Sequence, residues 1–189
     1  GLVEGTTTRY LLGDDWHSLD LTPLIEKYRH HLTFVVENDV NAMALGETWF
    51  GVGEEDRHVL YVYLGYGLGA GLIIDGVLYR GAYGNAGELG HMSIDAHGPN
   101  CSCGLKGCLG PIADGTHVML KIAEAIKNGT PTSMTLDSLY LENFIEAALN
   151  GDKLCSDLLD EMISNVSRGI ISAINLLNPS RVILGGLLC

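Results

Sequence analysis

The stretch from residue 88 to residue 108, ELGHMSIDAHGPNCSCGLKGC, constrains the fold most, because it gathers three cysteines and one histidine in a short, glycine-rich span. Sulfur and imidazole are the donors that zinc prefers in proteins. The intervening glycines let the backbone turn tightly enough to aim four side chains at one point. Four donors fill a tetrahedral shell and leave no open position. The pattern therefore predicts a structural zinc site, in a loop at residues 88–110, held by His91, Cys101, Cys103 and Cys108 (the zinc tetrad).

A disulfide or unliganded thiols would also account for these cysteines. A disulfide would use two of the thiols, but Cys101 and Cys103 are too close in sequence to pair easily. The chain also shows no targeting segment that points to an oxidising compartment. Unliganded thiols remain open as well, although burial does not account for three cysteines in a polar loop. The remaining cysteines, Cys155 and Cys189, lie in apolar surroundings and are predicted to be core residues.

Composition bounds the kind of protein. With 189 residues, 47% of them hydrophobic, the chain is long enough for one domain with a substantial core. No apolar run reaches the ~18 residues of a membrane span, so we expect a cytoplasmic protein with no membrane contact. The net charge of −12, with only 11 basic residues, argues against nucleic-acid binding by this chain itself.

Hydrophobic patterns predict an alternation of strands and helices. The Asp75-Gly76 pair is a strong hairpin signal, so residues 59–80 are expected to form an antiparallel meander. The predicted strands are 33–37, which we expect to be buried, 59–65, 70–76 and 181–186. The predicted helices are a short one leading in from residues 19–25, then 42–51, 112–129, one or two within 133–152, and a long amphipathic helix at 153–177.

Two short polar segments lie where ligands are often bound. Asn38 and Asp39 stand at the change from a predicted strand to a helix, which is where open α/β sheets bind ligands. Helix capping also accounts for these residues and is the favoured interpretation from chemistry alone. Gly65, Gly67 and Gly69 would let a backbone approach a phosphate closely, but a tight hairpin accounts for them about as well.

Five motifs together resemble the ROK family, which contains bacterial sugar kinases and sugar-responsive transcriptional repressors. They are ENDVNAMALGE (37–47), LGYGLGAGLIIDGVLYRG (64–81), GELGHM (87–92), CSCGLKGC (101–108) and VILGG (182–186). The resemblance implies an α/β, actin-like and ribonuclease-H-related fold with two lobes and the sugar between them. Residues 1–189 would form one sugar-binding fragment, mainly the second lobe. Both ends look cut from a longer protein, so we expect the N-terminal lobe, its DxGxT phosphate loop and any helix-turn-helix domain to lie upstream.

The resemblance also implies roles for individual residues. It assigns zinc to the zinc tetrad, and it assigns the sugar to Asn38, Asp39, Glu88 and His91 (the sugar residues). In the kinases of the family, the aspartate matching Asp39 is the general base for the sugar hydroxyl. In those enzymes the glycines matching Gly65, Gly67 and Gly69 meet the phosphates of ATP, which is bound with magnesium.

Two departures from the kinase pattern favour the repressors. Tyr66 replaces the threonine that meets ATP phosphate, and Gly110 replaces a glutamate that contacts the sugar. The first hypothesis is therefore the effector-binding part of a repressor that binds a sugar, forms a homodimer, and contacts DNA through an upstream domain. The second is an ATP-dependent sugar kinase with Asp39 as the base. A decayed relative with neither role is the third.

Overall fold

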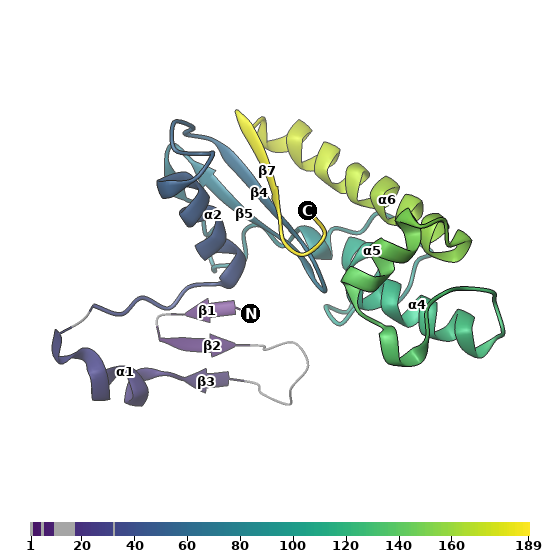
Figure 1. Ribbon diagram of the computed structural model, residues 1–189. Coiled ribbons are helices and arrows are strands. Elements are labelled where there is room, and N and C mark those ends of the chain that lie inside the picture. Colours follow the sequence, from purple (N-terminus) through teal and green to yellow (C-terminus); the bar gives the residue numbers. More distant parts are fainter. Residues whose placement is uncertain (1, 5, 10–17, 32) are drawn as a thin grey trace.

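The core of the protein is a four-stranded mixed sheet in the order β6-β5-β4-β7, seen in a computed structural model that describes residues 2–4, 6–9, 18–31 and 33–189 (Figure 1). β4 (Val59–Leu64), β5 (Leu68–Ile74) and β6 (Val77–Leu78) form an antiparallel meander. β7 (Arg181–Gly185) returns parallel to β4. The predicted meander and the last strand are confirmed. Asp75 and Gly76 make the hairpin turn with positive φ angles of 55° and 79°.

Helices cover both faces of this sheet. Alternate side chains point to opposite faces of a strand, so Val59 and Tyr61 pack with α2 (Asp39–Phe50) on one face. Leu60 and Val62 face a larger cluster that includes residues of α3 (Leu109–Ala113), α4 (Gly115–Lys127), α5 (Leu141–Leu149) and α6 (Lys153–Leu177). Figure 1 shows α2 and α6 on opposite sides of the sheet.

The helix predictions are confirmed with small changes at the ends. α6 spans residues 153–177 as predicted, and Asn178 closes it in the left-handed conformation at φ 45°. The predicted helix at 112–129 is divided at Asp114 into α3 and α4. Cys155 is buried as predicted, whereas Cys189 is exposed, so its placement in the core is wrong. Within the described ranges, no helix combines the length and the apolar character that a bilayer span requires.

The N-terminal part forms a separate antiparallel sheet that the sequence did not predict. It consists of β1 (Leu2–Glu4), β2 (Thr7–Arg9) and β3 (Ser18–Asp20), followed by α1 (Thr22–Tyr28) and the 3-10 turn η1 (Arg29–His31). The strand predicted at 33–37 is wrong, because these residues are irregular and Val35 is 79% exposed. A strand exists only with a hydrogen-bonded neighbour, and none of the described strands pairs with this segment.

Candidate functional site

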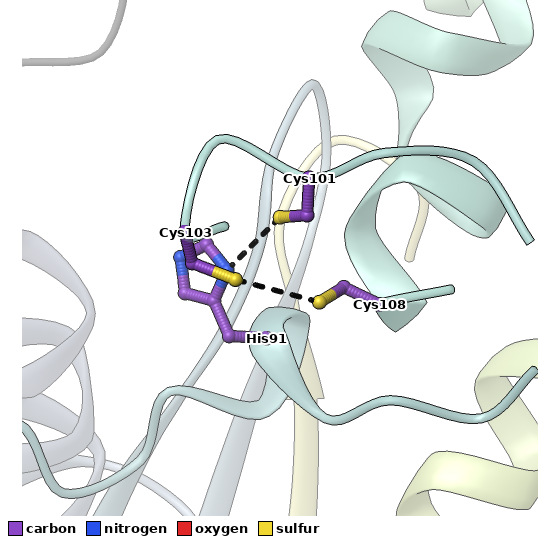
Figure 2. A group of neighbouring side chains, drawn as sticks. All are labelled: His91, Cys101, Cys103 and Cys108. Atoms are coloured by element: carbon purple, nitrogen blue, oxygen red, sulfur yellow. Dashed lines mark hydrogen bonds between the residues drawn. The ribbon is translucent and has the colours of Figure 1, made fainter. Parts of the chain in front are cut away.

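The zinc tetrad forms one compact cluster (Figure 2). The donor atoms of its four residues all lie within 4.8 Å of one another. His91 Nδ1 lies 3.3 Å from Cys101 Sγ, and Cys103 Sγ lies 3.6 Å from Cys108 Sγ. In a tetrahedron with zinc–ligand bonds of about 2.0–2.3 Å, neighbouring ligand atoms are about 3.3–3.8 Å apart. The donor set and these distances fit zinc in a closed, structural shell.

The loop holds this cluster together through backbone contacts. η2 (Leu89–His91) carries His91, and an isolated bridge pairs Ser93 with Cys108, which stands directly before α3. Gly107 has a φ of 64°, and a Cβ there would lie 1.5 Å from the carbonyl oxygen of Asp95. Only glycine fits at this position, so the loop can close on itself and direct the cysteines inward.

The acidities of the thiols follow from their crowding. Burial opposes ionisation of Cys101, but hydrogen bonds from the backbone and thiol of Cys103 and from His91 lower its pKa to about 6. Burial, with added contributions from Cys103 and Cys101, raises the pKa of Cys108 to about 12. The cluster thus releases its first proton easily and its last with difficulty. A divalent cation would hold all three cysteines as thiolates.

The second ring nitrogen of His91 connects the zinc loop to a carboxylate. While Nδ1 faces the thiols, Nε2 lies 3.9 Å from Glu88 Oε2. Both side chains remain partly exposed, at 41% for His91 and 46% for Glu88. Two of the four sugar residues are therefore brought together, and both can reach a ligand from solvent.

The other two sugar residues begin α2. Asn38 caps the helix, because its Oδ1 accepts hydrogen bonds from the backbone N–H groups of Val40 at 2.9 Å and Asn41 at 3.1 Å. The capping interpretation is confirmed for Asn38. Asp39 is the first helical residue and is exposed. Among the residues that the structure describes, no hydrogen bond or ion pair joins Asp39 to Glu88 or His91.

β5 supports both halves of this arrangement. A Cβ on Gly71 would lie 2.6 Å from the Ala44 side chain and 3.0 Å from the Val40 carbonyl, so α2 packs directly on the strand backbone. From the loop that leads to Glu88, Gly87 accepts a 2.9 Å hydrogen bond from Ala70 N–H. With a φ of 86°, a Cβ on Gly87 would lie 2.1 Å from the Ala70 carbonyl. Adjacent residues of one strand therefore fix the α2 N-terminus and the Glu88 loop.

The predicted phosphate-binding glycines occupy two different settings. Gly65 and Gly67 form the β4–β5 turn (residues 65–67), where Gly65 N–H donates to the Gly67 carbonyl at 3.0 Å. Gly69 lies in β5, and a Cβ there would lie 3.3 Å from Val40. Beside the turn is a cavity of about 350 Å³, lined mainly by apolar side chains such as Met162 and Val166. No Lys, Arg or His of the described residues lines it.

Tyr66 ties the β4–β5 turn to two helices. Its carbonyl accepts hydrogen bonds from the backbone N–H of Thr116, at 3.1 Å, and from the Thr116 hydroxyl, at 2.8 Å. Its phenol oxygen accepts from the N–H of Leu141, at 3.4 Å, at the start of α5. The phenol therefore spans from the turn to α5 rather than projecting freely.

Sequence reasoning missed Glu37 and Arg80, which form an ion pair of 2.6 Å beside the sugar residues. Both line a cavity of about 440 Å³ together with Asn38. A signal was present, because Glu37 directly precedes the helix cap and Arg80 follows a hairpin strand in a chain with few basic residues.

A family model described as "ROK family" matches residues 8–189. The xylose repressor of Caldicellulosiruptor bescii is 33% identical, over 98% of this chain and 48% of its own length. A solved ROK family transcriptional regulator, a homologue of the Escherichia coli MLC protein, has a TM-score of 0.85 at 33% identity, covering 98% of this chain and 48% of that one.

A kinase is comparably similar. The ROK family glucokinase of Streptomyces griseus, solved with glucose and AMPPNP, has a TM-score of 0.79 at 34% identity, covering 92% of this chain and 58% of the kinase. These likenesses confirm the predicted actin-like α/β fold. The chain spans about half the length of the curated relatives it matches.

Proposed function

Because the chain belongs to the ROK family, we propose that it is the effector-binding part of a sugar-responsive transcriptional repressor. In this proposal the sugar lies between Asp39 at the start of α2 and the Glu88–His91 pair. The protein acts as a homodimer in the cytoplasm and contacts DNA through a domain upstream of this chain. The net charge of −12 supports that last point, because phosphate binding needs a basic surface.

The chemistry of the sugar residues supports a polyhydroxylated ligand. Each sugar hydroxyl both donates and accepts hydrogen bonds, and exposed carboxylates such as Asp39 and Glu88 accept from such groups. Zinc bound at Nδ1 would fix the ring of His91, which leaves Nε2 to meet a hydroxyl. The metal then shapes the sugar site without taking part in any chemical step.

The contacts of Tyr66 are the observation that favours the repressor over the kinase. In place of a small hydroxyl side chain, the β4–β5 turn carries a phenol engaged with the N-terminus of α5. The cavity beside the turn is mainly apolar, and Asp114 supplies the one charged side chain among the described residues that line it. Such a lining suits triphosphate poorly, because phosphates are bound by cations and by free N–H groups.

The setting of Gly110 supports the same interpretation. A Cβ at this position would lie 3.2 Å from the Gly90 carbonyl and 3.4 Å from Asp114 Oδ2. A glutamate here would start between two oxygen acceptors, which disfavours a second carboxylate. The site is therefore better suited to a ligand that does without that contact.

The second candidate is an ATP-dependent sugar kinase. Asp39 favours it, because an exposed carboxylate at the first position of a helix is suitably free to take a proton from a hydroxyl. The likeness to a glucokinase solved with glucose and AMPPNP adds support. In that case ATP and magnesium would approach the β4–β5 turn at Gly65 and Gly67, with Gly69 behind it.

An assay on the full-length protein that contains this chain distinguishes the repressor from the kinase. D-glucose, D-xylose and N-acetyl-D-glucosamine are each added with ATP and magnesium, and ADP release and thermal stability are measured. The proposal expects no steady ADP release, together with a rise in melting temperature for at least one sugar. Steady release with any of them replaces the repressor by the kinase. Absence of both signals contradicts both functions.

A further inference from the structure

The carboxylate of Glu37 lies at the centre of a network beside the sugar residues. Its Oε2 accepts hydrogen bonds from Arg80 Nε at 2.9 Å and Arg80 Nη2 at 2.6 Å. Its Oε1 accepts from the backbone N–H of Asn38 at 3.0 Å and from Asn41 Nδ2 at 3.1 Å. Both oxygens are thus used, and each is directed to a different structural element.

This pair differs from an ordinary surface ion pair. The Glu37 side chain is only 14% exposed, while the Arg80 side chain is 50% exposed. Burial opposes ionisation of Glu37, yet Asn41, Asn38 and Arg80 together hold its pKa below its usual value. A shielded carboxylate gripped by two guanidinium N–H groups is held far more firmly than two solvated charges.

On the α2 side, Glu37 fixes the residues that present Asp39. Among the described residues, Asn41 is one of two buried polar side chains, at 4% exposure, and its amide nitrogen donates to Glu37. Asn38 caps the helix while its backbone N–H donates to the same oxygen. The segment before α2 has no strand pairing among the described residues, and Glu37 joins it to Arg80 and to Asn41.

On the other side, Arg80 shapes the loop that carries Glu88. Its carbonyl accepts a 3.2 Å hydrogen bond from the Ala86 N–H, which closes the loop two residues before Glu88. Its guanidinium reaches across to Glu37. One residue therefore folds the Glu88 loop with its backbone and grips the α2 N-terminus with its side chain.

We propose that Glu37 and Arg80 are a positioning pair that sets sugar affinity by holding Asp39 in register with Glu88. The inference rests on the sugar site proposed above, and the pair acts through the sugar residues rather than on the sugar itself. Both halves are already seated on β5 by close packing on its backbone, including residues 69–71. The pair adds a direct link between them at the level of the ligand.

The test is a double-substitution cycle in the full-length protein. Arg80→Met, Glu37→Gln and the double variant are titrated with D-glucose, D-xylose and N-acetyl-D-glucosamine by calorimetry. Each single substitution is expected to lower the affinity for the sugar that binds the wild type by about tenfold. The double variant is expected to have an affinity no lower than that of the single variant that binds more weakly. Arg80→Lys, which keeps the charge but not the two-point grip, is expected to recover part of the loss.

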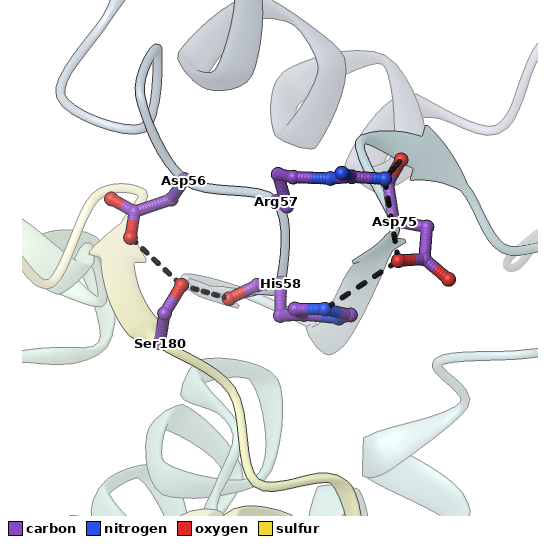
Figure 3. Close-up of polar contacts among 5 residues, drawn as sticks. All are labelled: Asp56, Arg57, His58, Asp75 and Ser180. Atoms are coloured by element: carbon purple, nitrogen blue, oxygen red, sulfur yellow. Dashed lines mark hydrogen bonds and ion pairs between the residues drawn. The ribbon is translucent and has the colours of Figure 1, made fainter.

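A matched control lies at the β5–β6 turn. There Arg57 pairs with Asp75 at 3.4 Å, with both side chains 71% exposed (Figure 3). Arg57→Met also removes an arginine from a carboxylate pair and is expected to leave sugar affinity unchanged. Faster amide exchange at Asn38 and Asn41 in Arg80→Met, but not in Arg57→Met, would show the loosened α2 terminus without any ligand.

The outcomes separate this inference from the proposed function. If the wild type binds a sugar and the Arg80 variants bind it equally well, the positioning pair is refuted and the sugar site stands. If losses in the single variants simply add in the double variant, the residues do not act as a pair, and the inference is again refuted. If the wild type binds none of the sugars, the sugar site and the pair are refuted together.

Discussion

Removal of zinc from the loop at residues 88–110 is expected to weaken sugar binding by about 5- to 150-fold. The geometry sets this range. The Nδ1 atom of His91 faces the thiols, and its Nε2 atom lies on the side of Glu88. Without zinc the ring can rotate, and the hydrogen bond that we propose from Nε2 to the sugar would be lost. A lost hydrogen bond of this kind costs about 1–3 kcal/mol, which corresponds to that change in affinity.

Thermodynamic linkage makes the prediction stricter. If zinc raises the affinity for sugar by a certain factor, sugar must raise the affinity for zinc by the same factor. The assay is therefore a competition for zinc between the full-length protein and a chromogenic chelator, with and without saturating sugar. The free zinc concentration at half loading should fall with sugar, by the factor that calorimetry gives for zinc-loaded against zinc-free protein.

A control separates the tetrad from thiols in general. Cys189 is an exposed cysteine outside the loop, so Cys189→Ser should release zinc as the wild type does. Cys108→Ser, at a fully buried ligand position, should lose most of its zinc. If sugar binds the zinc-loaded protein but leaves the zinc competition curve unchanged, His91 does not couple the two sites and the reasoning is wrong.

Three further predictions concern the scaffold and the nucleotide. Gly107→Ala is expected to lower zinc content and to destabilise the fold by more than about 2 kcal/mol in thermal melts, because the added Cβ would lie 1.5 Å from the Asp95 carbonyl. Gly104→Ala is the control: this residue also has a positive φ but has open space around it, so the substitution should destabilise the fold less. Asp152 is partly buried, yet hydrogen bonds from Ser133, Cys155 and Thr132 lower its pKa well below the usual value. Its carboxylate therefore stabilises the fold above a pH of about 4, and this stabilisation is lost as the pH falls. Asp152→Asn should reduce the free energy of unfolding by about 1–3 kcal/mol at pH 7. In urea titrations, the difference in unfolding free energy between the wild type and this variant should become smaller toward pH of about 3. AMPPNP with magnesium should not raise the melting temperature of the wild type, whereas Tyr66→Thr should gain a measurable rise; a rise in the wild type would count against the repressor.

The zinc site could be predicted from the sequence because its information is local. Four donors within residues 91–108, separated by glycines, have few ways to be arranged, and they meet as predicted. The meander and α6 were predictable for the same reason, since turn residues and a repeating apolar row are read within one segment. The prediction of a strand at 33–37 was wrong although these residues favour a strand locally. A strand also needs a hydrogen-bonded neighbour, and whether one is available depends on the whole fold.

The Glu37–Arg80 pair shows the same limit for the candidate site. Its members are 43 residues apart, and neither type of residue is unusual at a surface. Two structural features distinguish the pair from an ordinary surface ion pair: the Glu37 carboxylate is shielded from solvent, and it joins two structural elements. Both depend on tertiary packing, so the local signals, a glutamate before a helix cap and an arginine after a hairpin strand, do not show that the two residues meet.

The glycines of β5 bring α2 directly against the backbone of the strand. For Gly69 the sequence offered phosphate binding or a tight hairpin, but the surroundings of Gly69 and Gly71 indicate helix packing instead, since Val40 and Ala44 lie where their side chains would be. This close contact fixes the distance between α2 and β5. The Glu88 loop is fixed to the same strand through Gly87 and Ala70. A sugar held between Asp39 and Glu88 would therefore move α2 and the zinc loop as one body, and a signal to DNA would be carried by displacement of that body rather than by rearrangement within it.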